Sequence, residues 1–118
     1  MLGLIPRPLH AVMDYLWGIA HYVAPEMLDY DGDEAANIFS KVRGGSAIGA
    51  SLFTRYELGL IRIMPFNMHL LGDLLGALLG LAAPWLFGFE KNEKARKAVL
   101  GFALIELVVV LLSRRDKK

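Results

Sequence analysis

The sequence contains two copies of one unit, offset by 59 residues with no gap. The matches include uncommon residue types in the same order, which shared hydrophobicity alone does not produce. The matched pairs are Pro6/Pro65, His10/His69, Asp14/Asp73, Leu16/Leu75, Ala24/Ala83, Pro25/Pro84, Glu34/Glu93, Ala36/Ala95, Leu52/Leu111 and Arg55/Arg114. We therefore predict a single domain over residues 1–118, with one repeat over about residues 1–59 and a second over about residues 60–118.

Each copy carries two apolar stretches, separated by charged or turn-rich joints. The stretches run over about residues 9–24, 38–53, 68–89 and 98–113. Pro6, Pro8 and Pro65 open the first helix of a repeat, where a missing N–H costs nothing, and Pro25 and Pro84 are expected to end it. Strict alternation of apolar and polar residues is missing, which disfavours strands. The pattern predicts an all-α fold.

Length and hydropathy predict that the four helices form a transmembrane bundle from two tandem helix–loop–helix repeats. The chain is 55% hydrophobic, with a mean hydropathy of +0.42. A spanning helix needs about 20 mostly apolar residues. No charge lies between Asp73 and Glu90, and Glu106 is the only charge between Lys97 and Arg114. The third and fourth stretches therefore come close to the required length.

The first two stretches are more polar. His10, Asp14 and His21 interrupt the first, and Lys41 and Arg43 enter the second. Long basic side chains can extend to a membrane interface. The alternative is that the second helix faces water in a soluble bundle.

Several functional classes are excluded by composition. The chain has no cysteine, which excludes disulfides, a cysteine zinc site and a cysteine nucleophile. A net charge of +1 offers no field that would attract nucleic acid. A phosphate-binding loop, a serine triad and an H-E-x-x-H motif are all missing, so no cofactor and no enzymatic activity are predicted.

His10 with Asp14, and His69 with Asp73, are the candidate site residues. A spacing of four places each pair on one face of its helix. One interpretation is local, with each Asp bonded to its own His and fixing the packing near the helix start. The other is a shared site of two imidazoles and two carboxylates, which would bind a transition-metal ion or relay a proton. Contact with another subunit or with lipid headgroups is a third use.

Glu106 lies near the middle of the most apolar stretch, and its repeat counterpart is Ala47. Buried without a cation, such a carboxyl group is expected to be neutral. It could bond a helix across the bundle, be capped by a neighbouring subunit, or carry protons. His21 could be its partner.

Small residues favour close helix packing in lipid, where van der Waals contact drives association. Gly45 and Gly49 form a G-x-x-x-G spacing in the second stretch. Gly72, Gly76 and Gly80 form two overlapping copies in the third. These glycines could serve the internal bundle or a homo-oligomer.

Because each unit has two helices, both chain ends and the middle joint are expected on one side of the membrane. The two repeats are then related by a pseudo-twofold axis along the membrane normal. Lys and Arg on this side slightly outnumber those on the other, which favours cytoplasmic termini. The basic tail, Arg114 to Lys118, is expected to bind anionic headgroups.

The second repeat resembles a known family. Residues 83–89 read Ala-Pro-Trp-Leu-Phe-Gly-Phe, which is similar to the Ser-Pro-Trp signature of the SPW-repeat membrane proteins. The spacing from Pro65 through His69 to Asp73, and the joint over residues 52–59, also look like that family. The resemblance covers nearly the whole chain, in two copies.

The sequence departs from the family signature at three positions. Ala24 and Ala83 stand at the Ser position, and Glu26 stands at the Trp position of the first copy. The resemblance implies an integral protein of the bacterial cytoplasmic membrane. Tryptophan has an apolar ring and a polar N–H, so Trp85 at the end of a spanning helix is expected to be anchored at headgroup level. The resemblance implies no established activity.

The function expected from these observations is that of a structural or interaction module in the lipid bilayer, which self-associates into a homo-oligomer. The alternative is transport or sensing of protons or metal ions through the His and Asp residues. A membrane enzyme acting on a lipid or quinone, with the His–Asp pairs as general base and orienter, is the third hypothesis.

Overall fold

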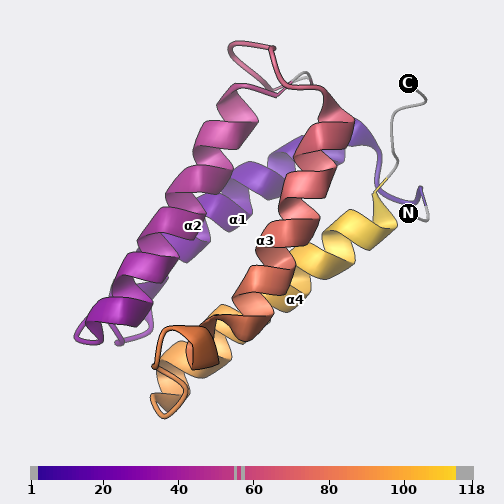
Figure 1. The fold of residues 1–118 in the computed structure, drawn as a ribbon. Coiled ribbons are helices and arrows are strands. Elements are labelled where there is room, and N and C mark those ends of the chain that lie inside the picture. Colours follow the sequence, from indigo (N-terminus) through magenta and orange to yellow (C-terminus); the bar gives the residue numbers. More distant parts are fainter. Residues whose placement is uncertain (1–2, 55, 57, 114–118) are drawn as a thin grey trace.

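A computed structural model describes residues 3–54, 56 and 58–113 of the chain. Its helices form two antiparallel hairpins, α1–α2 and α3–α4 (Figure 1). The helices are α1 (Arg7–Met27), α2 (Glu34–Leu52), α3 (Phe66–Leu86) and α4 (Glu93–Leu112). The all-α prediction with two helices per repeat is confirmed. Arg55 and the basic tail, Arg114 to Lys118, lie outside the described residues.

Both repeats begin their helices in the same way. Pro6 and Pro65 are the N-cap residues of α1 and α3. Asp33 and Asn92 cap α2 and α4, and each side chain accepts a hydrogen bond from the backbone N–H three residues later. Such a cap satisfies an N–H group that has no partner inside the helix. The equivalent caps set the same helix register in both repeats.

Pro25 and Pro84 do not end α1 and α3, so this expectation from the sequence was wrong. Each helix continues for two further residues. A proline in the last turn removes only one hydrogen bond, and this is tolerated so close to the helix end. The proline carbonyls then accept from the N–H groups of Tyr30 and Phe89, both at 2.8 Å, and these bonds close the turn.

Backbone contacts between the repeats follow a pseudo-twofold axis. The Ile5 N–H donates to the Leu112 carbonyl at 2.8 Å, and the Met64 N–H donates to the Phe53 carbonyl at 2.8 Å. Ile5 and Met64 are equivalent under the offset of 59 residues, and so are Phe53 and Leu112, so the two bonds are equivalent. The described segments that precede α1 and follow α4, and the middle joint, lie toward one end of the bundle, away from the two hairpin loops (Figure 1).

Packing is tight within each hairpin and sparse between the hairpins. At the α1–α2 crossing, a Cβ on Gly44 would lie 2.5 Å from the Tyr22 nitrogen and 2.6 Å from the Gly18 oxygen. In the other hairpin, a Cβ on Gly80 would lie 2.8 Å from the Ala103 Cβ. The missing side chains of Gly44 and Gly80 therefore permit the close helix approach.

The other glycines singled out in the sequence do not make this internal contact. A Cβ on Gly49 or Gly72 would meet nothing within 4 Å, and one on Gly45 would meet only the Tyr22 ring, at 3.9 Å. Gly76 makes room for the guanidinium group of Arg43 rather than for a helix backbone. The use of the open glycines between copies of the chain stays a prediction.

Replacing Gly44 by alanine is expected to destabilise the protein by about 1–3 kcal/mol, because the new methyl group would meet the backbone of α1. Gly49→Ala in the same helix is the matched control. It is expected to leave stability unchanged or raise it by up to about 1 kcal/mol, since alanine favours the helix. Thermal unfolding of both variants in one detergent measures the difference. Equal midpoints would contradict the close crossing at Gly44.

One described helix, α3, is long and apolar enough to cross a membrane. It has 21 residues and a mean hydropathy of 1.4 in its best window. The other three helices do not meet this criterion, because they carry more charged and polar residues than α3, in which Asp73 is the only charged residue. By this measure the described chain has one of the four spans expected from the sequence.

The outer surface of the bundle is nevertheless strongly apolar, and its interior is rich in polar groups. Leu16 is 64% exposed, Leu75 58% and Ile105 55%. His10 and Glu106, in contrast, are buried, at 0% and 7% exposure. Many large apolar side chains are thus exposed while several ionisable groups are buried, a combination that is uncommon in proteins surrounded by water.

Candidate metal centre

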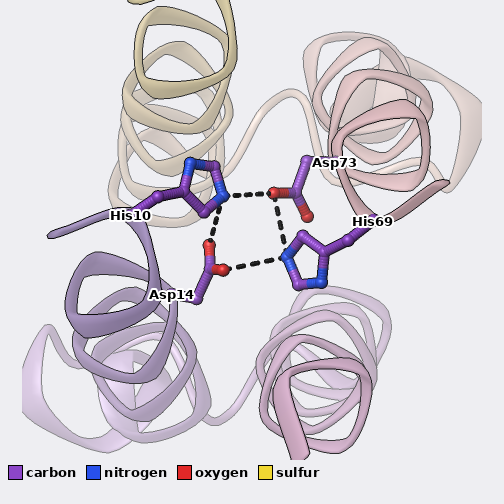
Figure 2. Close-up of side chains that lie close together, drawn as sticks. All are labelled: His10, Asp14, His69 and Asp73. Carbon is purple, nitrogen blue, oxygen red and sulfur yellow. Dashed lines mark hydrogen bonds and ion pairs between the residues drawn. The ribbon is translucent and has the colours of Figure 1, made fainter. Parts of the chain in front are cut away.

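His10, Asp14, His69 and Asp73 meet between the two hairpins and form a closed ring (Figure 2). The Nε2 atom of His10 lies 3.1 Å from Asp14 Oδ1 and 3.1 Å from Asp73 Oδ2. The Nε2 atom of His69 lies 2.9 Å from Asp14 Oδ2 and 3.2 Å from Asp73 Oδ2. Each histidine thus contacts one aspartate of its own repeat and one of the other. The two pairs are joined into one cluster.

The helices explain how the ring forms. His10 and Asp14 project from one face of α1, and His69 and Asp73 from the equivalent face of α3. The backbones of these two helices are not in contact within the described part of the chain. The four side chains therefore span the space between the repeats, and they provide a direct link between the two hairpins.

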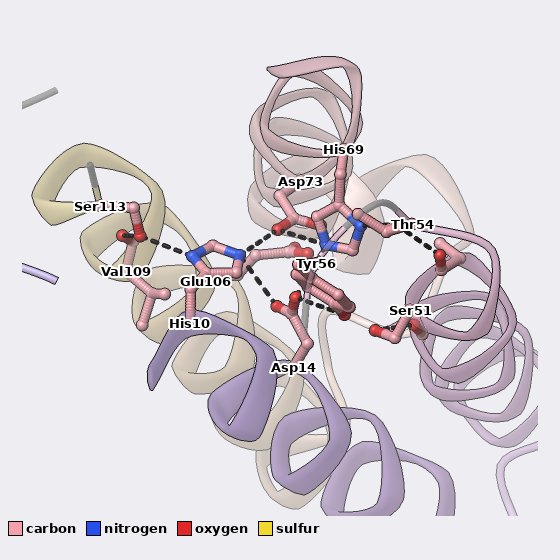
Figure 3. A network of polar contacts seen from close by, with 12 residues as sticks. His10, Asp14, Ser51, Thr54, Tyr56, His69, Asp73, Glu106, Val109 and Ser113 are labelled. Carbon is pink, nitrogen blue, oxygen red and sulfur yellow. Dashed lines mark hydrogen bonds and ion pairs between the residues drawn. The ribbon is translucent and has the colours of Figure 1, made fainter. Parts of the chain in front are cut away.

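The second nitrogen of each histidine contacts a hydroxyl group (Figure 3). His10 Nδ1 lies 2.5 Å from Ser113 Oγ, and His69 Nδ1 lies 2.7 Å from Thr54 Oγ1. Each hydroxyl donates its own proton to the backbone carbonyl four residues earlier. A hydroxyl has one proton, so it can only accept from the imidazole. Nδ1 therefore carries a proton in both histidines, and Nε2 is the atom that faces the carboxylates.

Two states of the ring satisfy this arrangement. In the first, both Nε2 atoms also carry protons, and two imidazolium ions pair with two carboxylates. In the second, both Nε2 atoms are bare and bind a divalent cation at the centre. A bare nitrogen without a cation would place its lone pair against carboxylate oxygens. The ring has no net charge in either state, so it can exchange two protons for one divalent ion without a change in the net charge of the interior.

The donor atoms have the spacing of ligands around one ion. One donor atom from each residue lies within 4.8 Å of all the others. Ligands with bonds of about 2.0–2.2 Å to a tetrahedral ion are roughly 3.3 Å apart. The four nitrogen–oxygen contacts between neighbours in this ring are 2.9 to 3.2 Å long. The buried His69 Nε2 contacts both carboxylates without the alignment of a hydrogen bond. Once this nitrogen gives up its proton, its lone pair is available to an ion.

The chemistry of the donors fits a first-row transition metal. Imidazole nitrogen together with carboxylate oxygen suits ions such as Zn²⁺, Fe²⁺ or Co²⁺. Metal-binding histidines usually donate their other N–H to an outer group, which fixes the tautomer and the ring orientation. Ser113 and Thr54 accept in this way here.

Tyr56, from the joint between the repeats, supports one ligand of the ring. Its hydroxyl donates to Asp14 Oδ2 at 3.1 Å, and the residue is 2% exposed. Burial, together with the Asp14 carboxylate beside it, raises the pKa of the Tyr56 phenol above its ordinary value. The phenol therefore remains a donor at neutral pH.

Glu106 is buried, and its partner is a cation of the same chain. The Arg43 Nη2 atom lies 2.6 Å and 2.7 Å from the two carboxylate oxygens of Glu106. The guanidinium also lies 5.1 Å from the ring centre of Trp17 and against Gly76. Arg43 thus contacts the other three helices, and it does not extend to a membrane interface as the sequence suggested. Glu106 is therefore paired within its own chain, and not with a neighbouring subunit as one prediction from the sequence had it.

His21 does not pair with Glu106. Its ring stacks on Phe102 with 4.3 Å between ring centres, and it meets Trp17 edge to face. Neither ring nitrogen has a hydrogen-bond partner among the described residues.

The two hydroxyl groups were not predicted from the sequence, although a signal for them exists. Thr54 and Ser113 are related by the same offset of 59 residues as the His–Asp pairs. Both residues carry a hydroxyl group, and each lies within two residues of the end of the second helix of its repeat. The repeat therefore conserves polar groups between its two copies as well as identical residues.

Arg43 was also missed as the partner of Glu106. The repeat counterparts of these two residues are Phe102 and Ala47, so each charge stands where the other copy is apolar. Two opposite charges that each break the repeat are a signal for an ion pair. From the sequence, Arg43 was expected to extend to a membrane interface or to lie on a water-facing helix, because no internal partner had been identified for it.

Comparison of the chain with protein-family models, curated proteins and solved structures gives no match. The resemblance to the SPW-repeat proteins therefore stays a prediction. The headgroup position of Trp85 also stays a prediction, although this side chain is exposed, near the end of α3. The fold by itself does not define a function, because a four-helix bundle supports many activities.

Proposed function

We propose that this chain is an integral membrane protein that binds one divalent transition-metal ion between its two repeats. The observation that carries the proposal is the closed ring of His10, Asp14, His69 and Asp73, with Nδ1 of each histidine held by a hydroxyl group. This arrangement leaves two Nε2 atoms and two carboxylates directed at one another. It favours the metal-ion alternative over a purely structural module.

The apolar outer surface supports membrane placement of all four helices. In water an exposed apolar surface is unfavourable by about 25 cal/mol per Å², whereas in lipid it is the surface expected of a helix bundle. Ionisable groups inside a membrane are expected to face the bundle interior and to pair with one another. The ring and the Arg43–Glu106 pair both do so. Helices of 19 to 21 residues extend about 30 Å, the thickness of the hydrocarbon core.

The bound ion would fasten the two hairpins together. Its ligands come in equal number from α1 and α3, and the hairpins share few other contacts. Metal occupancy would therefore be coupled to the relative position of the hairpins. This coupling is the physical basis of a metal-ion sensor, and it joins the structural role to the metal role.

The double variant Asp14→Asn, Asp73→Asn tests this function. Chelator-treated wild-type protein is expected to take up one Zn²⁺ per chain, and the double variant is expected to lose more than about 100-fold in affinity. Asparagine keeps the shape and can still bond the imidazoles, so the fold should be retained. Dialysis followed by elemental analysis measures the bound zinc, and circular dichroism checks the helices.

Two further variants make this test specific. Asp29→Asn changes an exposed aspartate that pairs with Lys94 at the surface, and should bind zinc like the wild type. Thr54→Val removes one outer hydroxyl and is expected to weaken binding by about 10–100-fold. Saturable binding of equal affinity in the wild type and the double variant would contradict the assignment. Failure of the folded wild type to bind zinc, cobalt or iron would contradict it as well.

A further inference from the structure

A cavity of about 280 Å³ lies beside the ring, between α1 and α4. Most of its walls are apolar, and Trp17 and Phe102 contribute aromatic surfaces. The Trp17 Nε1–H donates to the Phe102 carbonyl at 2.8 Å, which fixes one wall. Asp14, Asp73 and Glu106 also line the cavity. An apolar space therefore adjoins two ligands of the ring.

The cavity opens sideways rather than toward the ends of the bundle. Leu16, Ala20 and Ile105 line it and are exposed, so they form its rim. At a rise of 1.5 Å per residue, all three lie at least about 10 Å from the ends of α1 and α4. In the membrane placement proposed above, this opening faces the hydrocarbon of the bilayer. A molecule that enters must be soluble in lipid.

The polar groups of the cavity select for a hydrogen-bond donor. Ionised carboxylates only accept hydrogen bonds. Both imidazole contacts of Asp73 fall on Oδ2, which leaves the acceptor capacity of Oδ1 unused by the histidines. The negative charges of Asp14, Asp73 and Glu106 are balanced by Arg43 together with either two imidazolium ions or one divalent ion. A neutral donor would keep this balance, whereas a cationic one would not.

The size of the cavity limits the ligand. An apolar cavity of about 150 Å³ in another protein holds one benzene molecule. A space of 280 Å³ therefore accommodates one aromatic ring with a short alkyl substituent. Trp17 and Phe102 offer that ring aromatic contacts.

We propose that the α1–α4 cavity binds a neutral, lipid-soluble phenolic molecule of one ring, whose hydroxyl donates to Asp73. The inference rests on the membrane placement in the proposed function, but it does not depend on whether a metal ion binds. The phenol would be a second ligand of the His–Asp ring, and it would reach that ring through the lipid.

Fluorescence of Trp17 tests the proposal. The chain has two tryptophans, so Trp85→Phe leaves Trp17 as the single reporter. In chelator-treated protein in lipid nanodiscs, 4-propylphenol is expected to change the emission saturably. 4-Propylanisole, in which the hydroxyl is methylated, is expected to bind at least tenfold more weakly.

Cavity-filling variants separate binding from partition into lipid. Ala20→Phe places a ring in the mouth of the cavity and should abolish the saturable change. Ile19→Phe adds a ring to the same helix at an exposed position outside the cavity lining, and should leave it intact. Val109→Phe fills the cavity from α4, and it replaces Ala20→Phe in the test if that variant does not fold.

Three results would overturn the inference: no saturable change, binding that persists in both cavity-filling variants, or equal affinity for the two probes. The last result would indicate an acyl chain as the occupant. Zinc binding is measured on the same preparation. Zinc uptake without binding of the phenol overturns only this inference, whereas binding of the phenol without zinc uptake overturns only the metal assignment.

Discussion

Arg43→Ala is expected to lower the free energy of unfolding by about 3–5 kcal/mol, because it leaves the buried carboxylate of Glu106 without a cation. Glu106 is 7% exposed, and Arg43 provides the contact to both of its oxygens. The same guanidinium lies over Trp17 and against Gly76, so its loss also removes packing among all four helices. Unfolding by heat or by denaturing detergent, with helix content as the signal, measures the loss.

Two comparisons show whether the ion pair is the cause. In the double variant Arg43→Met, Glu106→Leu no charge is left without a partner, and most of the stability should return, since apolar replacement of a buried pair is often neutral or stabilising. Lys41→Ala removes a more exposed cation of α2, paired with Glu26, and should change stability little. A double variant no more stable than Arg43→Ala would indicate that lost packing, not the unpaired charge, dominates.

The apparent affinity for Zn²⁺ is expected to fall about 100-fold for each pH unit below neutrality. In the metal-free ring each Nε2 lies about 3 Å from two carboxylate oxygens and carries a proton. Binding of one ion displaces both protons, and each displaced proton contributes a factor of ten per pH unit. A lower pH favours the protonated ring, so protons compete with the metal and the affinity decreases.

Calorimetry in buffers of different ionisation enthalpy counts the protons directly. We expect about two protons released per ion for the wild type. His10→Gln leaves one imidazole in the ring, so its weaker binding should release about one proton and vary about tenfold per pH unit. Release of no protons, or an affinity independent of pH, would refute the assignment of protons to both Nε2 atoms.

The four helices, and the starts of α1 and α3, could be read from the sequence, because their causes are local. Pro6 and Pro65 precede the first helix of each repeat, as predicted. The ends were less predictable. Pro25 and Pro84 were expected to stop their helices, but a proline in the last turn disturbs only one bond.

Predictions about helix contacts were weaker, because spacing identifies a face of a helix but not the neighbour of that face. Gly45 and Gly49 have the spacing typical of close packing, yet Gly44 makes the contact with α1. The two faces differ by one residue, or about 100° around the helix. Gly76 was identified as a packing residue, and the group it accommodates is a side chain of another helix, Arg43.

By itself the sequence determined the repeat, the two hairpins, and one His–Asp pair on a single face of each equivalent helix. These features depend on residues a few positions apart, or on an offset that can be read along the chain. Only the tertiary structure decided that the pairs meet, that Ser113 and Thr54 orient the imidazoles, and that Arg43 neutralises Glu106. Ser113 and His10 are 103 residues apart, and helical periodicity carries no information about which distant side chains the packing of two hairpins brings within hydrogen-bonding distance.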